Sequence, residues 1–272
     1  MTTTGMVKSS TPVVTMSPDG APFDLIVPDW PAPSSVRAIS TTRRGGVSLP
    51  PYDGLNLGSH VNDDPAAVFE NRRRLAALAA FPAEPVWLSQ VHGIAVLDAA
   101  QTAIGSAADA SFSAEPGVVC VIQTADCLPV LFCDTAGRVV AAAHAGWRGL
   151  AAGVLEQTVA AMTGRGVLAE TIMAWLGPAI GPAAFEVGAE VWAAFVAHDP
   201  AAADAFVAQA DGKWLADIFL LARQRLNACG VSMIYGGGVC THGDPERFFS
   251  HRRDRLTGRQ ASLIWLAPVS RA

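Results

Sequence analysis

The sequence predicts a single domain of the α/β class, in which helices cover mixed β-sheets. Segments with helical periodicity and short apolar segments of β type are mixed along the whole chain, which is the pattern of an α/β or α+β protein. Several expected strands are apolar on both faces, which indicates sheets that are covered on both sides. The 272 residues fit one large domain, and neither a repeat nor a linker divides them.

Four helices are expected. The first begins at Asp64, an N-cap residue followed by Pro65 at the first helical position, and runs to about Ala80. The clearest helix is residues 214–229, because its apolar residues recur at spacings of three and four and Gly230 follows it. The other two are expected at residues 149–162 and 188–197.

Eight segments have the composition of strands, and a turn at residues 135–137 should join two of them. The strands are expected at residues 86–88, 95–97, 118–123, 129–133, 139–143, 171–176, 231–235 and 262–266. Residues 1–22 are rich in Thr, Ser and Pro and lack the apolar region of a signal peptide. We expect a disordered leader there, followed by one catalytic domain at residues 23–272.

Composition excludes several classes of function. The formal net charge is -5, and no basic stripe is present to bind the phosphates of a nucleic acid. No segment approaches the roughly 20 consecutive apolar residues of a membrane span. We therefore expect a cytoplasmic protein without a nucleic-acid or membrane partner. In that reducing compartment, each of the five cysteines is core, ligand or nucleophile.

Three candidate metal ligands, His92, Cys127 and His144, lie where expected strands give way to loops. Two imidazoles and one thiolate form a known zinc set, and three protein ligands leave a fourth position open for water or substrate. Their spacing leaves the alternatives open, because a lone Cys is usually core and a lone His is usually a loop residue. Asp126 adjoins Cys127 and could orient a ligand or act as a general base.

Around these residues the chain resembles the laccase-domain family, also called multicopper polyphenol oxidase-like or YfiH-like. The resemblance extends from about residue 36 to residue 266 and rests on ordered blocks of sequence. These blocks are TTRRGGVS (41–48), NLG (56–58), SQVHG (89–93), TADC (124–127), HAGWRG (144–149), LGPAIGP (176–182), FEVG (185–188) and SHRRD (250–254).

The resemblance implies a layered α/β/β/α sandwich and a zinc-dependent enzyme of purine nucleosides. The implied main activity is phosphorolysis of adenosine, inosine, guanosine and methylthioadenosine, with adenosine deamination beside it. The family's zinc ligands correspond to His92, Cys127 and His144, and copper is the less favoured metal. The family often has cysteines where this chain has Ala183-Ala184, which argues against an essential thiol there.

Phosphorolysis requires groups that hold phosphate and nucleoside. Arg148 follows His144 in the first turn of an expected helix, where an anion is favoured, and could clamp a phosphate. Arg43 lies in a Gly-rich loop that a ligand can approach closely. Asn56 and Gln90 are amides that could bind ribose hydroxyls or a purine edge. For each of these residues a purely structural role, as a surface cation or a loop cap, is also consistent with the sequence.

Three rival functions remain. A copper polyphenol oxidase is disfavoured, because a multicopper centre consumes many histidines and none of the six histidines forms a His-x-His pair. A Cys–His hydrolase acting on a cell-wall precursor would use Cys127 as nucleophile and need no metal. A non-enzymatic module would keep the metal only for stability. The oligomeric state is not indicated by the sequence.

Overall fold

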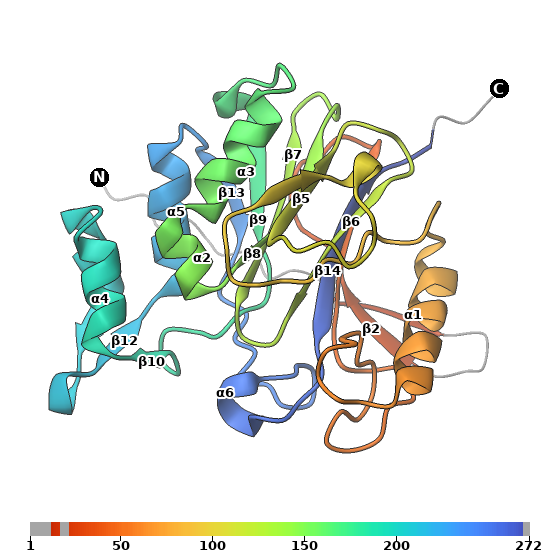
Figure 1. Ribbon diagram of the computed structural model, residues 1–272, viewed down its shortest axis with the longest axis horizontal. Coiled ribbons are helices and arrows are strands. Elements are labelled where there is room, and N and C mark those ends of the chain that lie inside the picture. The colour runs from red at the N-terminus through yellow and green to blue at the C-terminus, as the bar shows by residue number, and fades with distance from the viewer. Residues whose placement is uncertain (1–11, 17–21, 269–272) are drawn as a thin grey trace.

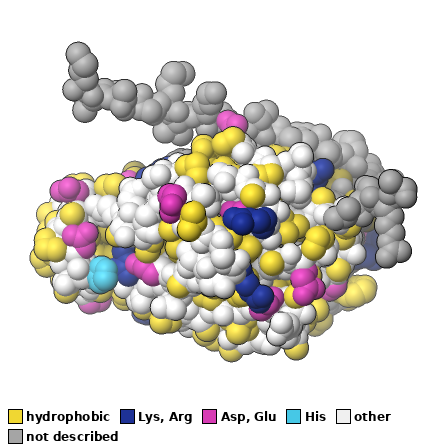
Figure 2. All heavy atoms as spheres, turned by 90° about the horizontal axis from the view of Figure 1, so that it is seen from above, with side chains coloured by type: hydrophobic (Ala, Val, Ile, Leu, Met, Phe, Trp, Pro, Cys, Tyr) yellow, Lys and Arg dark blue, Asp and Glu magenta, His cyan; other side chains and the backbone are white. Residues whose placement is uncertain are grey.

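The computed structural model describes residues 12–16 and 22–268 (Figure 1). Within these ranges two large sheets pack face to face, and helices cover their outer faces. The predicted single-domain α/β class, layered as an α/β/β/α sandwich, is confirmed. None of the described helices is long and apolar enough to cross a bilayer. On the face shown in Figure 2, basic, acidic and apolar side chains are interspersed.

The first sheet is antiparallel and has the strand order β1-β2-β3-β14-β6. Its strands are β1 (Pro12–Met16), β2 (Pro22–Ile26), β3 (Val36–Thr41), β14 (Gln260–Leu266) and β6 (Val119–Thr124). Side chains alternate between the two faces: Val119 and Val121 lie in the cluster that contains Leu75 of α1 (Pro65–Ala79), and Cys120 and Ile122 pack against the second sheet. Helix α1 begins as predicted, because the Asp64 side chain accepts the N–H of Ala66.

The second sheet is mixed and has the strand order β13-β9-β7-β8-β5-β4. Its strands are β13 (Met233–Gly236), β9 (Ile172–Leu176), β7 (Leu128–Asp134), β8 (Val140–Ala145), β5 (Ala110–Ser113) and β4 (Val96–Asp98). Helices α2 (Trp147–Ala152), α3 (Val154–Thr163) and α5 (Ile218–Ala228) cover its outer face (Figure 1). The predicted turn joins β7 to β8, with Gly137 in the left-handed conformation at φ 64°.

A small third sheet, with strand order β10-β12-β11, lies with α4 (Ala189–Val196) at one end of the molecule. Its strands are β10 (Glu186–Val187), β12 (Trp214–Ala216) and β11 (Phe206–Ala208). The remaining short helices are α6 (His251–Asp254) and the 3-10 turns Ala99–Gln101, Ala169–Thr171, Pro200–Ala205 and Ala210–Gly212.

Four expectations need correction. Residues 214–216 pair as strand β12, and α5 begins only at Ile218, because Asp217 caps the N–H groups of Phe219 and Leu220. The expected helix 149–162 is divided by Gly153, which adopts φ 106°. Val86 forms only an isolated bridge. Part of the expected disordered leader, residues 1–22, is a strand, because Pro12–Met16 pair with β2. Apart from Pro12–Met16 and Pro22, the leader lies outside the described residues.

Candidate metal centre

The fold brings His92, Cys127 and His144 together, as the sequence predicts. One ligand atom from each residue lies within 4.8 Å of the others, and Cys127 Sγ is 3.9 Å from His92 Nε2. Cys127 precedes β7 and His144 lies in β8, and the register that pairs Leu128 with Ala145 places them side by side. His92 joins from a loop in the left-handed conformation at φ 60°. We call these residues the triad. Its His92 side is exposed, whereas His144 is 3% exposed, so the cluster opens to solvent on one side.

Asp109 orients two of the three ligands and is the site residue that sequence reasoning missed. Its carboxylate, which is fully buried, accepts the backbone N–H groups of Val91, His92 and Gly93 at 3.2, 2.9 and 2.6 Å. It also lies 2.8 Å from His144 Nδ1. Burial by itself would raise the pKa of Asp109, but the bonds from His144, Gly93 and His92 lower it below its usual value. With Nδ1 bonded to Asp109, His144 presents Nε2 to the triad.

Gly146 leaves the space beside the triad open. A Cβ atom on this residue would lie 3.0 Å from His92 Cδ2 and 3.1 Å from Cys127 Sγ. Its φ of -62° is accessible to any residue, so the need for glycine is steric and not conformational. A side chain here would press on two of the three ligands.

The triad is electrostatically coupled. Burial would raise the pKa of the Cys127 thiol, but the charge and hydrogen bond of His144, together with His92, outweigh it and lower the pKa to about 6. Burial would lower the pKa of His144, but the Cys127 thiolate and Asp109 raise it to about 9. Without a metal, the pair is therefore thiolate and imidazolium at neutral pH. A metal ion would displace the imidazolium proton and bind a thiolate that is already formed.

The position of Asp126 next to Cys127 suggests a general base, but its carboxylate is used for hydrogen bonds within the protein. One carboxylate oxygen accepts the Thr241 hydroxyl at 2.7 Å. The other accepts the Ser250 hydroxyl at 2.9 Å and the Arg252 N–H at 2.6 Å. The residue is buried and adopts φ 89°, so this side chain ties the segment at residues 241–252 to the start of β7. The geometry supports a positioning role instead of proton transfer.

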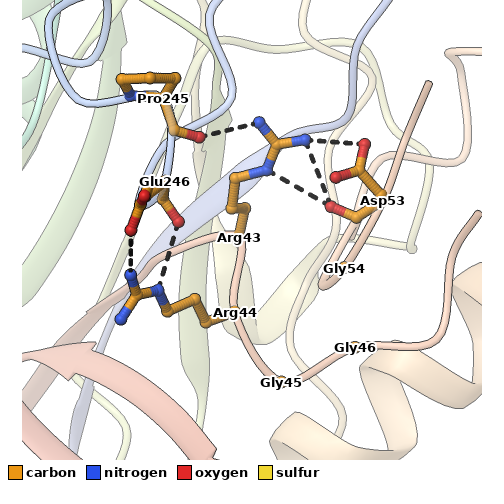
Figure 3. A pocket seen from close by; sticks show the side chains of 8 residues that line it. All are labelled: Arg43, Arg44, Gly45, Gly46, Asp53, Gly54, Pro245 and Glu246. Carbon is orange, nitrogen blue, oxygen red and sulfur yellow. Dashed lines mark hydrogen bonds and ion pairs between the residues drawn. The ribbon is translucent and has the colours of Figure 1, made fainter. Parts of the chain in front are cut away.

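Arg43 and Arg44 line an open groove of about 610 Å³ together with acidic and glycine residues (Figure 3). Both guanidinium groups are already paired: Arg43 contacts Asp53 at 2.9 Å and the Pro245 carbonyl at 3.0 Å, and Arg44 contacts Glu246 at 3.0 Å. Of the described residues that line this groove, none belongs to the triad. The predicted phosphate contact of Arg43 therefore lacks a free positive charge.

The two predicted amide contacts are structural. Asn56 is fully buried: its Nδ2 donates to Asp63 at 2.8 Å, and its Oδ1 accepts the N–H groups of Gly58 at 3.0 Å and Arg259 at 2.8 Å. Gln90 pairs with the backbone of Gln123, donating to its carbonyl and accepting its N–H, each at 2.8 Å. Their hydrogen-bonding capacity is used inside the protein, so neither is well placed to bind a nucleoside.

Arg148 is exposed, and its guanidinium stacks on the Trp147 ring at 4.4 Å. Within the described ranges it forms neither an ion pair nor a hydrogen bond through its side chain. Helix α2 has only six residues, so the anion-binding end that the sequence predicts there is short. A positively charged group nevertheless remains available two residues after Gly146.

These features define a class: an α/β sandwich that carries an open His–Cys–His cluster with a buried carboxylate behind it. Residues 37–267 match the family model described as multi-copper polyphenol oxidoreductase laccase. An Escherichia coli K12 relative named purine nucleoside phosphorylase YfiH is 60% identical over 243 residues, which are 89% of this chain and 98% of that protein.

Two solved structures share the fold. A Neisseria meningitidis protein of the DUF152 family is 51% identical with a TM-score of 0.86, covering 90% of this chain and 99% of its own. YlmD from Geobacillus stearothermophilus is 32% identical with a TM-score of 0.84, covering 95% and 100%. The chain belongs to this laccase-like, YfiH-related family.

Proposed function

We propose that this protein is a zinc-dependent purine nucleoside phosphorylase whose metal is held by His92, Cys127 and His144. The observation that carries the proposal is the open three-ligand cluster, found in a chain whose relatives are named purine nucleoside phosphorylases. Three protein ligands with a free fourth position are typical of catalytic zinc sites.

The donor set fits zinc. Zinc–sulfur and zinc–nitrogen bonds of about 2.3 and 2.05 Å in tetrahedral geometry place the two ligand atoms about 3.6 Å apart, and Cys127 Sγ and His92 Nε2 are 3.9 Å apart. Copper is the alternative that the family description suggests. A blue-copper centre adds a weak axial Met to two His and one Cys, and the cluster offers only His and Cys.

The proposed reaction joins phosphate to a purine nucleoside. An oxygen of hydrogen phosphate attacks the anomeric carbon of the ribose, and the bond from that carbon to the base nitrogen breaks. The phosphate proton passes to the base nitrogen, and ribose 1-phosphate and the free base leave. When bound, zinc would act as a Lewis acid that lowers the pKa of the attacking oxygen's proton or polarises that oxygen.

The chain's own residues prepare this chemistry. Asp109 fixes the His144 ring and the backbone that presents His92, so two ligands are held before the metal binds. Gly146 keeps the neighbouring space free. Adenosine, inosine, guanosine and methylthioadenosine are the candidate substrates. In adenosine deamination, water would instead attack C6 of the adenine ring, the bond from C6 to the exocyclic nitrogen would break, and inosine and ammonia would leave.

The experiment couples metal content to turnover. Protein purified without chelators or added metal is analysed for zinc and copper, and adenosine and inosine are then assayed with and without phosphate. We expect about one zinc per chain and phosphate-dependent release of base, both lost in Cys127→Ala and kept in the control Cys229→Ala. Cys229 is half-buried beyond the C-terminal end of α5, so the control removes a thiol outside the triad.

Each other outcome has a definite meaning. Ammonia release without a phosphate requirement would make deamination the main activity. Bound copper with oxidation of phenols would favour the polyphenol oxidase. Absence of bound metal and of nucleoside turnover would refute the proposal and leave the Cys–His hydrolase as the function to test.

A further inference from the structure

A second cavity lies beside the triad, between α1, the loop at residues 58–60 and the outer face of β6. We call it the α1 cavity. Its volume is about 240 Å³, below the roughly 300–1,000 Å³ of pockets that hold whole drug-sized ligands. It is lined by Ser59, His60, Arg72, Trp87, Leu88, Ser89, Gln90, Ile104, Gly105 and Gln123. A space of this size suits a small ligand or one part of a larger one.

The lining is basic and rich in hydrogen-bond donors. It contains a guanidinium, an imidazole and two hydroxyls but no Asp or Glu, although the whole chain is acidic. Arg72 stacks on Trp87 at 3.9 Å and donates Nε and Nη2 to the Leu57 carbonyl at 3.1 and 2.8 Å. Glu84, which accepts the Trp87 Nε1–H at 2.8 Å, acts on the charge of Arg72, but among the described residues no carboxylate forms an ion pair with it. The opposite holds in the groove of Figure 3, where Asp53 and Glu246 neutralise both arginines.

Gln123 points to a ligand independently of these charges. Strand alternation turns its side chain to the α1 face, the same face as Val119 and Val121. The side chain is 4% exposed and lines the cavity, yet its Oε1 has no partner, and its carboxamide makes no hydrogen bond among the described residues. A buried acceptor without a donor is destabilising, so a ligand with an O–H or N–H group in this cavity would relieve that cost.

The cavity adjoins the triad along two segments of chain. Ser89 and Gln90 lead directly to His92, and Gln123 lies four residues before Cys127 at the end of β6. The pKa of His60 is lowered by burial and by the charges of Arg259, Arg72 and His144. His60 in the cavity wall is therefore within electrostatic reach of two arginines and of His144 in the triad.

We propose that the α1 cavity is the site that holds inorganic phosphate as hydrogen phosphate, with Arg72 as a donor to its oxygens and Gln123 Oε1 as the acceptor of its P–OH group. Ser59, Ser89 and His60 supply further donors from the wall. This inference rests on the proposed phosphorylase function and assigns its second substrate. It also moves the phosphate site away from Arg43, whose charge is already paired.

The test measures phosphate binding directly and in turnover. Zinc-loaded protein is titrated calorimetrically with inorganic phosphate at constant ionic strength, and the KM for phosphate is measured at saturating inosine. Arg72→Gln should weaken both by about tenfold or more, because it removes a charge-assisted donor. Gln123→Met should weaken both by about three- to tenfold. Arg73→Gln, on the same helix and paired with Glu70, is the control and should change neither.

Gln123→Met also allows an effect on phosphate binding to be distinguished from a loss of stability. Its side chain has no hydrogen bond to lose, so its melting temperature should equal or exceed that of the wild type. Wild-type phosphate affinity in both variants, or no phosphate binding by the wild type, would overturn the inference. Unchanged KM in variants that still turn over would refute the site and leave the phosphorylase function intact. Variant-sensitive phosphate binding without any nucleoside turnover would refute that function and keep the site.

Discussion

The sharpest prediction concerns Asp109, the buried carboxylate behind the triad. In Asp109→Asn one carboxylate oxygen becomes an NH2 group, and the negative charge is lost. If that NH2 replaces Oδ2, it faces the N–H groups of Val91 and Gly93, which are donors that need an acceptor. If the NH2 group instead replaces Oδ1, it faces the N–H of His92 and the Nδ1 of His144. Either orientation breaks two of the four hydrogen bonds.

The magnitude follows from these bonds. A hydrogen bond to a charged acceptor contributes about 1.5–3 kcal/mol, so loss of two should lower the free energy of unfolding by about 3–6 kcal/mol. Removal of a residue that orients metal ligands typically weakens metal binding by about 10–100-fold, or about 1.4–2.8 kcal/mol. The loop should also relax, because His92 at φ 60° would lose the contact that holds its strained backbone.

The assay separates metal affinity from general instability. Zinc affinity is measured by competition with a chromophoric chelator, and unfolding is followed with and without zinc. Asp134→Asn is the matched control, because Asp134 is equally buried and accepts backbone N–H groups of Arg138 and Val139 in the β7–β8 turn. It should lower stability and leave zinc affinity unchanged. If Asp109→Asn binds zinc as tightly as the control, the orienting role of Asp109 is refuted.

Three further predictions concern the same centre. Gly146→Ala should weaken zinc binding while the protein stays folded, because its Cβ would lie 3.0 Å from the His92 ring and 3.1 Å from Cys127 Sγ. Zinc bound as tightly as by the wild type would disprove the steric argument. In metal-free protein, the rate of alkylation of Cys127 by iodoacetamide should rise with pH through a midpoint near 6, because the thiolate is the nucleophile. His144→Gln should move that midpoint upward, and mass spectrometry of the Cys127 peptide measures the rate. Asn56→Ala should lower the free energy of unfolding by about 2–4 kcal/mol, because its buried partners lose their hydrogen bonds. A change of less than about 0.5 kcal/mol would mean that the hydrogen bonds of Asn56 do not stabilise the fold.

The layers of the fold were predictable where the local signals were strong. Strands β6, β7, β8, β9 and β14 are apolar segments at least five residues long, and the start of α1 carries its cap in the sequence. The pattern failed where tertiary pairing decides. Trp214–Ala216 continues the helical spacing of α5, yet its backbone pairs with β10 and β11. Strand β5 contains Ala, Ser and Phe, without the β-branched composition by which strands were recognised.

The residues of the candidate site were also predictable only in part. The triad could be found because its three residue types are the chemistry of a zinc site and each stands at or near the end of an apolar segment of the sequence. Arg43, Asn56 and Gln90 were chosen as polar groups in loops, but residues distant in sequence already satisfy them: Pro245, Arg259 and Gln123. No local pattern reveals such partners, because they depend on how loops from different sheets meet.

The two acids near the triad show why adjacency in the chain is a poor guide to role. Asp126 adjoins Cys127, but its backbone at φ 89° directs the carboxylate to Thr241, Ser250 and Arg252. Asp109 is 35 residues from His144, yet β5 pairs antiparallel with β8, and the register that aligns Ala110 with Ala143 sets it opposite that ligand. The His144 N–H then donates to the Asp109 carbonyl at 2.7 Å, so one residue fixes both the backbone and the ring of His144. Because β5 is a strand that sequence patterns do not mark, the acid that orients the metal ligands becomes visible only once that pairing is known.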